Sequence, residues 1–78
     1  MTSRREMRIL NDMRNLIVKE GAINKYDLMI RSEISVSYYD KLSPILQHLY
    51  GPRIEYDRRS KNWLDRQTHK KITEEAQK

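Results

Sequence analysis

The sequence predicts a mainly α-helical domain in which three helices form the core and a small β-hairpin closes it. Three observations indicate this fold class. Apolar residues recur at spacings of three and four in two segments, 4–20 and 35–50, and a shorter segment with an N-cap signal lies between them. After Gly51-Pro52 the pattern changes to the alternation of short strands. The chain has 78 residues, two Gly, two Pro and no Cys, which suits one domain with one modest core.

The first helix is expected over residues 4–20. Ser3 and Glu6 have the spacing of a capping box, in which each side chain satisfies a free backbone N–H of the other residue. Gly21 can take the left-handed conformation that commonly ends a helix. Between these signals runs an apolar stripe that consists of Met7, Ile9, Leu10, Met13, Leu16 and Ile17.

The second helix follows a short strand-like piece at Ala22-Ile23. It is expected to begin after Asn24, a suitable N-cap, and to end at about Ser32. Its buried residues are predicted to be Leu28 and Ile30, with Met29 as a further candidate.

The third helix is expected to start at Ser35 or Ser37 and to end at about Tyr50. Pro44 lies inside it, where a proline removes one backbone donor. The helix either bends there and continues, or breaks so that Ser43 caps a new helix. Because the apolar stripe keeps its phase through the proline, we favour a continuous, kinked helix.

The hairpin is expected from two alternating segments, 53–57 and 62–65, around a charged tip. This register places Tyr56 opposite Trp63. The tip lacks Asn-Gly or Asp-Gly, so a loose turn of four or five residues is predicted. The predicted core is Leu10, Met13, Leu16, Ile17, Ile23, Leu28, Ile30, Ile34, Tyr39, Leu42, Leu46, Leu49, Ile54 and Trp63.

The domain is expected to span residues 1–65. The remaining tail, 66–78, holds only Ile72 and Ala76 as apolar groups. It is predicted to be mobile or to form a frayed helix, because it has no face to bury.

Helix, short strand, helix, tight turn, helix and hairpin is the element order of a winged helix-turn-helix, with the hairpin as the wing. The segments that carry this order are 21–29 (GAINKYDLM), 34–39 (ISVSYY) and Leu42 through Leu49. Over about residues 5–65 the chain resembles small archaeal winged helix-turn-helix proteins regarded as predicted transcriptional regulators. The resemblance implies DNA binding, often as a dimer formed through a long C-terminal helix. Here the tail lacks the leucine repeat of a coiled coil.

The charge of the chain indicates its partner. A net charge of +5 points to a polyanion, with nucleic acid ahead of an anionic membrane surface. Over residues 58–71 the only acidic residue is Asp65, whereas the basic residues are Arg58, Arg59, Lys61, Arg66, Lys70 and Lys71. The predicted partner is therefore double-stranded DNA.

Several other classes of protein are not expected. The absence of Cys excludes disulfide scaffolds, thiol catalysis and zinc fingers. No apolar run approaches the roughly 18 residues of a membrane span, and the charged start does not resemble a signal peptide. The two His, at 48 and 69, have no metal-site spacing. We therefore expect a cytoplasmic, nucleoid-associated protein that is not an enzyme and uses no cofactor or metal, and no small-molecule ligand is evident from the sequence.

Two groups of residues are the main predicted DNA contacts, and a third group consists of candidates for flanking phosphates. On the outward face of the third helix, Ser37, Tyr38 and Lys41 are placed to meet base edges in the major groove, beside Pro44, Gln47 and His48. At the hairpin tip, Arg58, Arg59 and Lys61 suit the backbone or a narrow minor groove. Arg5, with Arg4 and Arg8, and Arg31 are candidates for flanking phosphates. The competing interpretation is that these are ordinary solvated side chains.

A second function class stays open. The third helix is nearly neutral, and Tyr26, Tyr38 and Tyr50 are aromatic residues of the kind enriched at protein interfaces. The chain would then be a winged-helix interaction module of a transcription or chromosome-organising assembly. A homodimer is a further possibility, through Met7, Ile9 and the tail of a second chain.

Overall fold

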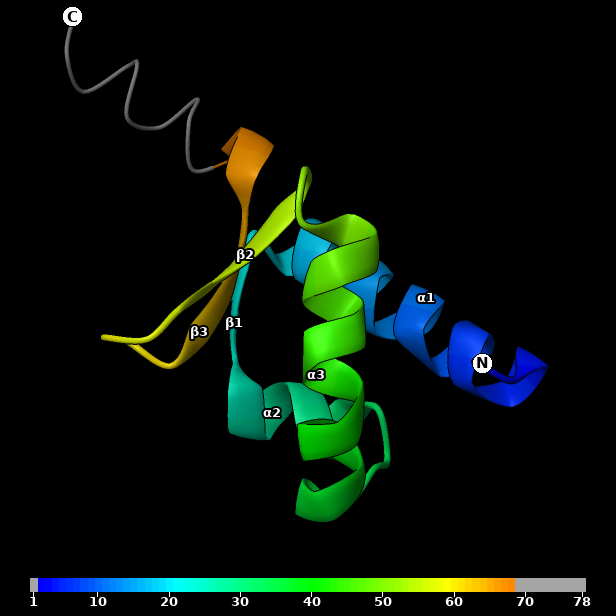
Figure 1. Ribbon diagram of the computed structural model, residues 1–78. Coiled ribbons are helices and arrows are strands. Elements are labelled where there is room, and N and C mark those ends of the chain that lie inside the picture. Colours follow the sequence, from blue (N-terminus) through cyan, green and yellow to red (C-terminus); the bar gives the residue numbers. More distant parts are fainter. Residues whose placement is uncertain (1, 69–78) are drawn as a thin grey trace, which may run out of the picture.

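The computed structural model describes residues 2–68, which form three helices and a three-stranded antiparallel sheet (Figure 1). The mainly helical fold class with a hairpin is confirmed. In chain order the elements are α1 (Arg4–Glu20), β1 (Ala22–Asn24), α2 (Lys25–Arg31), α3 (Val36–Tyr50), β2 (Ile54–Asp57) and β3 (Asn62–Asp65).

The ends of α1 are where the sequence predicts them. The Glu6 N–H donates to Ser3 Oγ at 3.1 Å, while the Ser3 hydroxyl donates to Glu6 Oε1 at 3.2 Å. At the other end, Gly21 has φ +77° and its N–H donates to the Ile17 carbonyl at 2.9 Å. The chain leaves the helix through this left-handed residue and enters β1.

The next two helices are capped by polar side chains. Asn24 Oδ1 accepts from the Tyr26 N–H at 3.0 Å and starts α2. Ser35, rather than Ser37, caps α3 by accepting from the Tyr38 N–H at 3.2 Å. Helix α3 continues through Pro44 without a break, because the apolar face on both sides of the proline packs on one core.

The sheet has the order β1-β3-β2, so the last strand lies in the middle. Tyr56 faces Trp63 across the hairpin as predicted, with ring centroids 5.4 Å apart. The tip comprises the four residues 58–61, as a loose turn requires. Asp57 shapes this tip: its carboxylate accepts from the Arg59 N–H at 3.1 Å and from the Ser60 hydroxyl at 2.8 Å.

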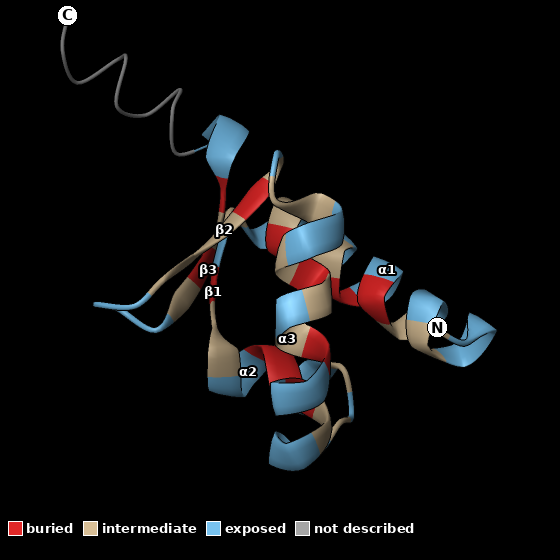
Figure 2. Cartoon of the chain, in the orientation of Figure 1, coloured by how far each residue is buried: buried red, intermediate tan, exposed pale blue. Residues whose placement is uncertain are grey.

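The core lies between the three helices and the sheet (Figure 2). The prediction that Ile30 and Leu49 are buried is wrong: they are 73% and 40% exposed. Helix α2 turns Leu28 and Met29 inward, which leaves Ile30 on its outer side, and Leu49 lies at the margin of the buried face of α3. Leu16 and Ile34 are half-buried. The buried apolar residues are Leu10, Met13, Ile17, Ile23, Leu28, Met29, Tyr39, Leu42, Leu46, Ile54 and Trp63.

Among the described residues one charged side chain, that of Asp65 at the end of β3, is buried, and no signal in the sequence predicts this burial. Arg53 Nε donates to Asp65 Oδ1 at 2.7 Å, and the Thr68 hydroxyl donates to Oδ2 at 2.7 Å. Burial alone raises the pKa of Asp65, but the hydrogen bonds from Arg53 and Thr68 outweigh it and leave the pKa below its usual value. Residues 66–68 form a helical turn; the rest of the predicted tail, 69–78, lies outside the described residues.

Candidate nucleic-acid interface

The hairpin tip gathers three cations. Arg58, Arg59 and Lys61 are all exposed, and within residues 2–68 none of them has a carboxylate partner within 4.0 Å. Figure 1 shows the tip projecting from the domain on the side away from the start of α1. The tip therefore presents positive charge that no neighbouring carboxylate in the described chain neutralises by a direct ion pair.

The second part of the site is the outward face of α3. Ser37, Lys41, Pro44 and His48 are exposed at spacings of four, three and four, so they form one stripe along the helix. Lys41 Nζ lies 3.9 Å from Glu6 Oε2, and its side chain is 61% exposed. We call these four residues the exposed stripe of α3.

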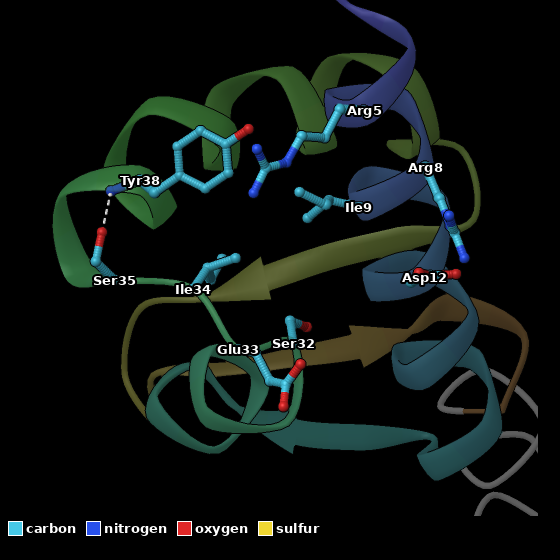
Figure 3. A pocket seen from close by; sticks show the side chains of 9 residues that line it. All are labelled: Arg5, Arg8, Ile9, Asp12, Ser32, Glu33, Ile34, Ser35 and Tyr38. Atoms are coloured by element: carbon cyan, nitrogen blue, oxygen red, sulfur yellow. Dashed lines mark hydrogen bonds between the residues drawn. The ribbon is translucent and has the colours of Figure 1, made fainter.

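Tyr38 does not belong to this stripe, contrary to the prediction. It is half-buried and packs against the core on the side of α3 that faces α1. Figure 3 shows its ring turned toward Arg5 of α1. The physical reason is the helix period: Tyr38 is one position after Ser37, which turns its side chain by about 100°.

A groove of about 500 Å³ separates the exposed stripe from the hairpin. Two residues that line it are joined by a buried hydrogen bond, in which Trp63 Nε1 donates to the Tyr39 hydroxyl at 2.9 Å. Burial raises the pKa of that hydroxyl, so it stays protonated at neutral pH. The groove is lined by Lys25, Tyr39, Asp40, Ser43, Pro44, Gln47, Tyr56, Arg58 and Trp63.

Lys25 is a cation that sequence reasoning missed at this site. Its N–H donates to the Lys61 carbonyl at 2.9 Å, which ties the start of α2 to the hairpin tip. The sequence predicts that Lys25 is the first residue of α2, directly after the N-cap Asn24, but it does not predict that this residue lies beside the hairpin. With Arg58, it is one of two basic residues that line the groove, which Asp40 also lines.

The predicted phosphate contacts are more dispersed. Arg31 is paired with Glu20, at 3.2 Å between Nη1 and Oε1. Arg5 lies at the start of α1, beside Tyr38 and away from the hairpin tip (Figures 1 and 3). The structure thus brings Ser37 and Lys41 together on one helix face and the three tip cations together on the hairpin.

No family model, curated protein or solved structure matches this chain. In residues 2–68 no group of three or more His, Asp or Glu side chains is arranged to hold a metal ion. The described helices also include none that has the length and apolarity needed to cross a bilayer.

Proposed function

We propose that this protein binds double-stranded DNA as a winged helix-turn-helix and regulates transcription. The observation that carries the proposal is the pairing of the hairpin tip with the exposed stripe of α3 across one groove. In this proposal α3 serves as the recognition helix and the hairpin serves as the wing. The regulatory role rests on the resemblance described for residues 5–65.

The hairpin tip and the exposed stripe of α3 make different contributions to DNA binding in this proposal. Arg58, Arg59 and Lys61 supply affinity by replacing counterions on the phosphates, and arginines at a wing also suit a narrow minor groove. Ser37 and Lys41 supply specificity, since a hydroxyl and an ammonium can hydrogen-bond base edges in the major groove. Asp40 beside them disfavours close approach of phosphate to that point of the helix.

The test is a fluorescence-anisotropy titration of a random duplex at several salt concentrations. The intact chain is compared with the triple variant Arg58→Ala, Arg59→Ala, Lys61→Ala. If each cation meets one phosphate, the log–log salt slope falls by about 3 in the variant. Lys19→Ala is the control, because Lys19 is exposed on the last turn of α1 and belongs to neither part of the site. An intact chain that does not bind even at low salt refutes the proposal.

A protein-interaction module is the second candidate, and one observation favours it. Tyr26 and Ile30 are 49% and 73% exposed and lie four residues apart, on the same side of α2. Aromatic residues such as Tyr are enriched at protein interfaces. An interface centred on them would be insensitive to salt and would weaken on Ile30→Ser, whereas DNA binding would weaken with salt and would be unchanged by Ile30→Ser.

A further inference from the structure

A second hollow lies on the other side of α3. It has a volume of about 640 Å³ and separates the start of α1 from the turn between α2 and α3 (Figure 3). Arg5 extends into it toward Tyr38, over the apolar side chains of Ile9 and Ile34. Within residues 2–68 Arg5 has no carboxylate within 4.0 Å. An arginine that forms no ion pair within the described part of the chain and a phenol hydroxyl therefore face the same space.

Charge is unevenly distributed around this hollow. Asp12 and Glu33 line its far end, and Arg8 extends toward Asp12 (Figure 3). At the Tyr38 end, Lys41 Nζ lies 5.9 Å from the ring centre. The carboxylate of Glu6 is 3.9 Å from that ammonium and offsets part of its charge. The end formed by Arg5 and Tyr38 is thus the cationic one, and it carries hydrogen-bond donors for an anion.

The hollow and the groove at the hairpin lie on opposite flanks of α3. Tyr38 lines the hollow and Gln47 lines the groove, and their separation along the chain amounts to about two and a half helical turns. Their side chains consequently point to opposite sides of the helix. The exposed stripe of α3 lies between them, and Figure 1 shows the start of α1 and the hairpin tip on either side of α3.

This arrangement matches the shape of a major groove. The groove of B-DNA is about 12 Å wide and an α-helix is about 10–12 Å across, so a helix in the groove has a phosphate backbone on each flank. A hairpin that grips the backbone on one flank leaves the opposite backbone facing the other side of the helix.

We propose that Arg5 and Tyr38 form a second phosphate site, which holds the DNA backbone on the flank of α3 opposite the hairpin. The inference rests on the proposed DNA binding and adds a second anchor to it. The guanidinium donates two parallel hydrogen bonds to phosphodiester oxygens, and the Tyr38 hydroxyl donates a third. Tyr38 thereby fixes the register of α3 in the groove without reading a base.

The experiment uses the full chain and a duplex selected from a random library as its preferred site. Single phosphates of this duplex are replaced in turn by neutral methylphosphonates, and binding is measured by anisotropy for each duplex. The scan is repeated with Arg5→Ala, with Tyr38→Phe and with the triple hairpin variant. Lys19→Ala is the control, since Lys19 lies about 20 Å along α1 from Arg5.

We expect Arg5→Ala to lower the salt slope by about 1, and Lys19→Ala to leave it unchanged. Tyr38→Phe weakens binding about 3- to 10-fold, equally for preferred and random duplexes, because a phosphate contact carries no sequence information. In Arg5→Ala, some phosphates can be neutralised without further loss of affinity. We expect these phosphates to lie across the major groove from the phosphates that behave in this way in the hairpin variant.

The outcomes separate the two proposals. If the intact chain fails to bind any duplex, the proposed function falls and the second phosphate site falls with it. If the chain binds and only the hairpin variant changes the slope, DNA binding stands and the second site is overturned. The second site is likewise overturned if Arg5→Ala and the hairpin variant abolish the effect of neutralising the same phosphates. It is also overturned if Tyr38→Phe changes the preferred DNA sequence.

Discussion

Trp63 Nε1 donates a hydrogen bond of 2.9 Å to the Tyr39 hydroxyl, and this buried contact joins strand β3 to helix α3. The two side chains are only 1% and 5% exposed. The ring of Tyr56 packs on Trp63 from the neighbouring strand. The middle of the hairpin and the first turn of α3 are therefore held together, which sets where the cationic tip lies relative to the exposed stripe.

Tyr39→Phe tests this link. The substitution keeps the ring and leaves the buried indole N–H without an acceptor, so we expect a loss of about 1–3 kcal/mol in the free energy of unfolding. Urea denaturation followed by the fluorescence of the single Trp measures it directly. Tyr26→Phe, at an exposed position, is the matched control and should change the stability by less than about 0.5 kcal/mol. Equal effects of the two substitutions would contradict a stabilising role for the hydrogen bond.

The ion pair of Arg53 and Asp65 closes the other end of the sheet. Arg53→Met retains much of the apolar stem but removes the charge that compensates the buried carboxylate. We expect a loss of about 2–3 kcal/mol at neutral pH, because Asp65 then keeps only its smaller hydrogen-bond partners. Arg66→Met serves as control, since Arg66 pairs with Glu55 at 3.7 Å on the surface. A surface pair of this kind contributes little.

The carboxylate of Asp65 makes the free energy of unfolding depend on pH in the acid range. The pKa of Asp65 is lowered in the folded state, so its contribution is present above its ordinary value of 3.8 and is lost as the pH falls through the folded value. The pKa of Asp57 is lowered too, by hydrogen bonds from the Ser60 hydroxyl and the Arg59 N–H, and this acts in the same direction. Urea midpoints measured from about pH 6 to about pH 2 should fall below about pH 4. In Asp65→Asn the urea midpoint should fall less as the pH is lowered. The midpoints of the variant and the intact chain should therefore become similar near about pH 2.

Gly21 is a position where the backbone requires glycine. Its φ is +77°, and a Cβ placed there would meet Thr68 Cγ2 at 3.2 Å. Its carbonyl also accepts from the Asp65 N–H at 2.8 Å, so the local backbone cannot move freely. We expect Gly21→Ala to cost about 1–2 kcal/mol of stability, measured by urea denaturation. Ala22→Gly, at the next position in β1, serves as a comparison. We expect it to lower the free energy of unfolding by about 1 kcal/mol, because glycine loses more conformational entropy on folding than alanine.

Within residues 2–68, two residues other than glycine occupy the left-handed region, and substitutions there separate stability from the proposed DNA binding. Lys61 has φ +60° at the hairpin tip, and Glu33 has φ +57° in the turn before α3. Glycine at either position relieves the strain, so we expect a gain of up to about 1 kcal/mol in the unfolding free energy. Lys61→Gly should also lower the salt slope of DNA binding by about 1, whereas Glu33→Gly should not lower it. If both variants bound DNA as the intact chain does, the tip lysine would have no part in binding.

The local elements of this protein could be predicted from its sequence because their signals lie within a few residues. Ser3, Gly21 and Asn24 mark helix ends through their own backbone and side-chain hydrogen bonds, which depend only on near neighbours. The partners Tyr56 and Trp63 also follow from the strand period, once a turn separates the two strands. The cationic tip needed only the order of charges along the chain.

The fate of individual side chains depended on which elements pack together. Ile30 is apolar yet exposed, because Leu28 and Met29 take the inner side of a helix too short to bury more. Asp65 is charged yet buried, because Arg53, which directly precedes β2, lies beside it and donates to its carboxylate. Such outcomes arise between elements that pack together only in the folded chain, and no local pattern carries that information.

The sequence by itself determined the elements, their order, the apolar faces that drive their collapse and the charge of the hairpin tip. Tertiary structure alone decided that α1 lies against the Tyr38 flank of α3, and that Arg5 meets Tyr38 across a hollow. The physical reason is that a helix offers several neighbouring faces at similar cost, and only the packing of α1 and the sheet against α3 selects which of them is covered.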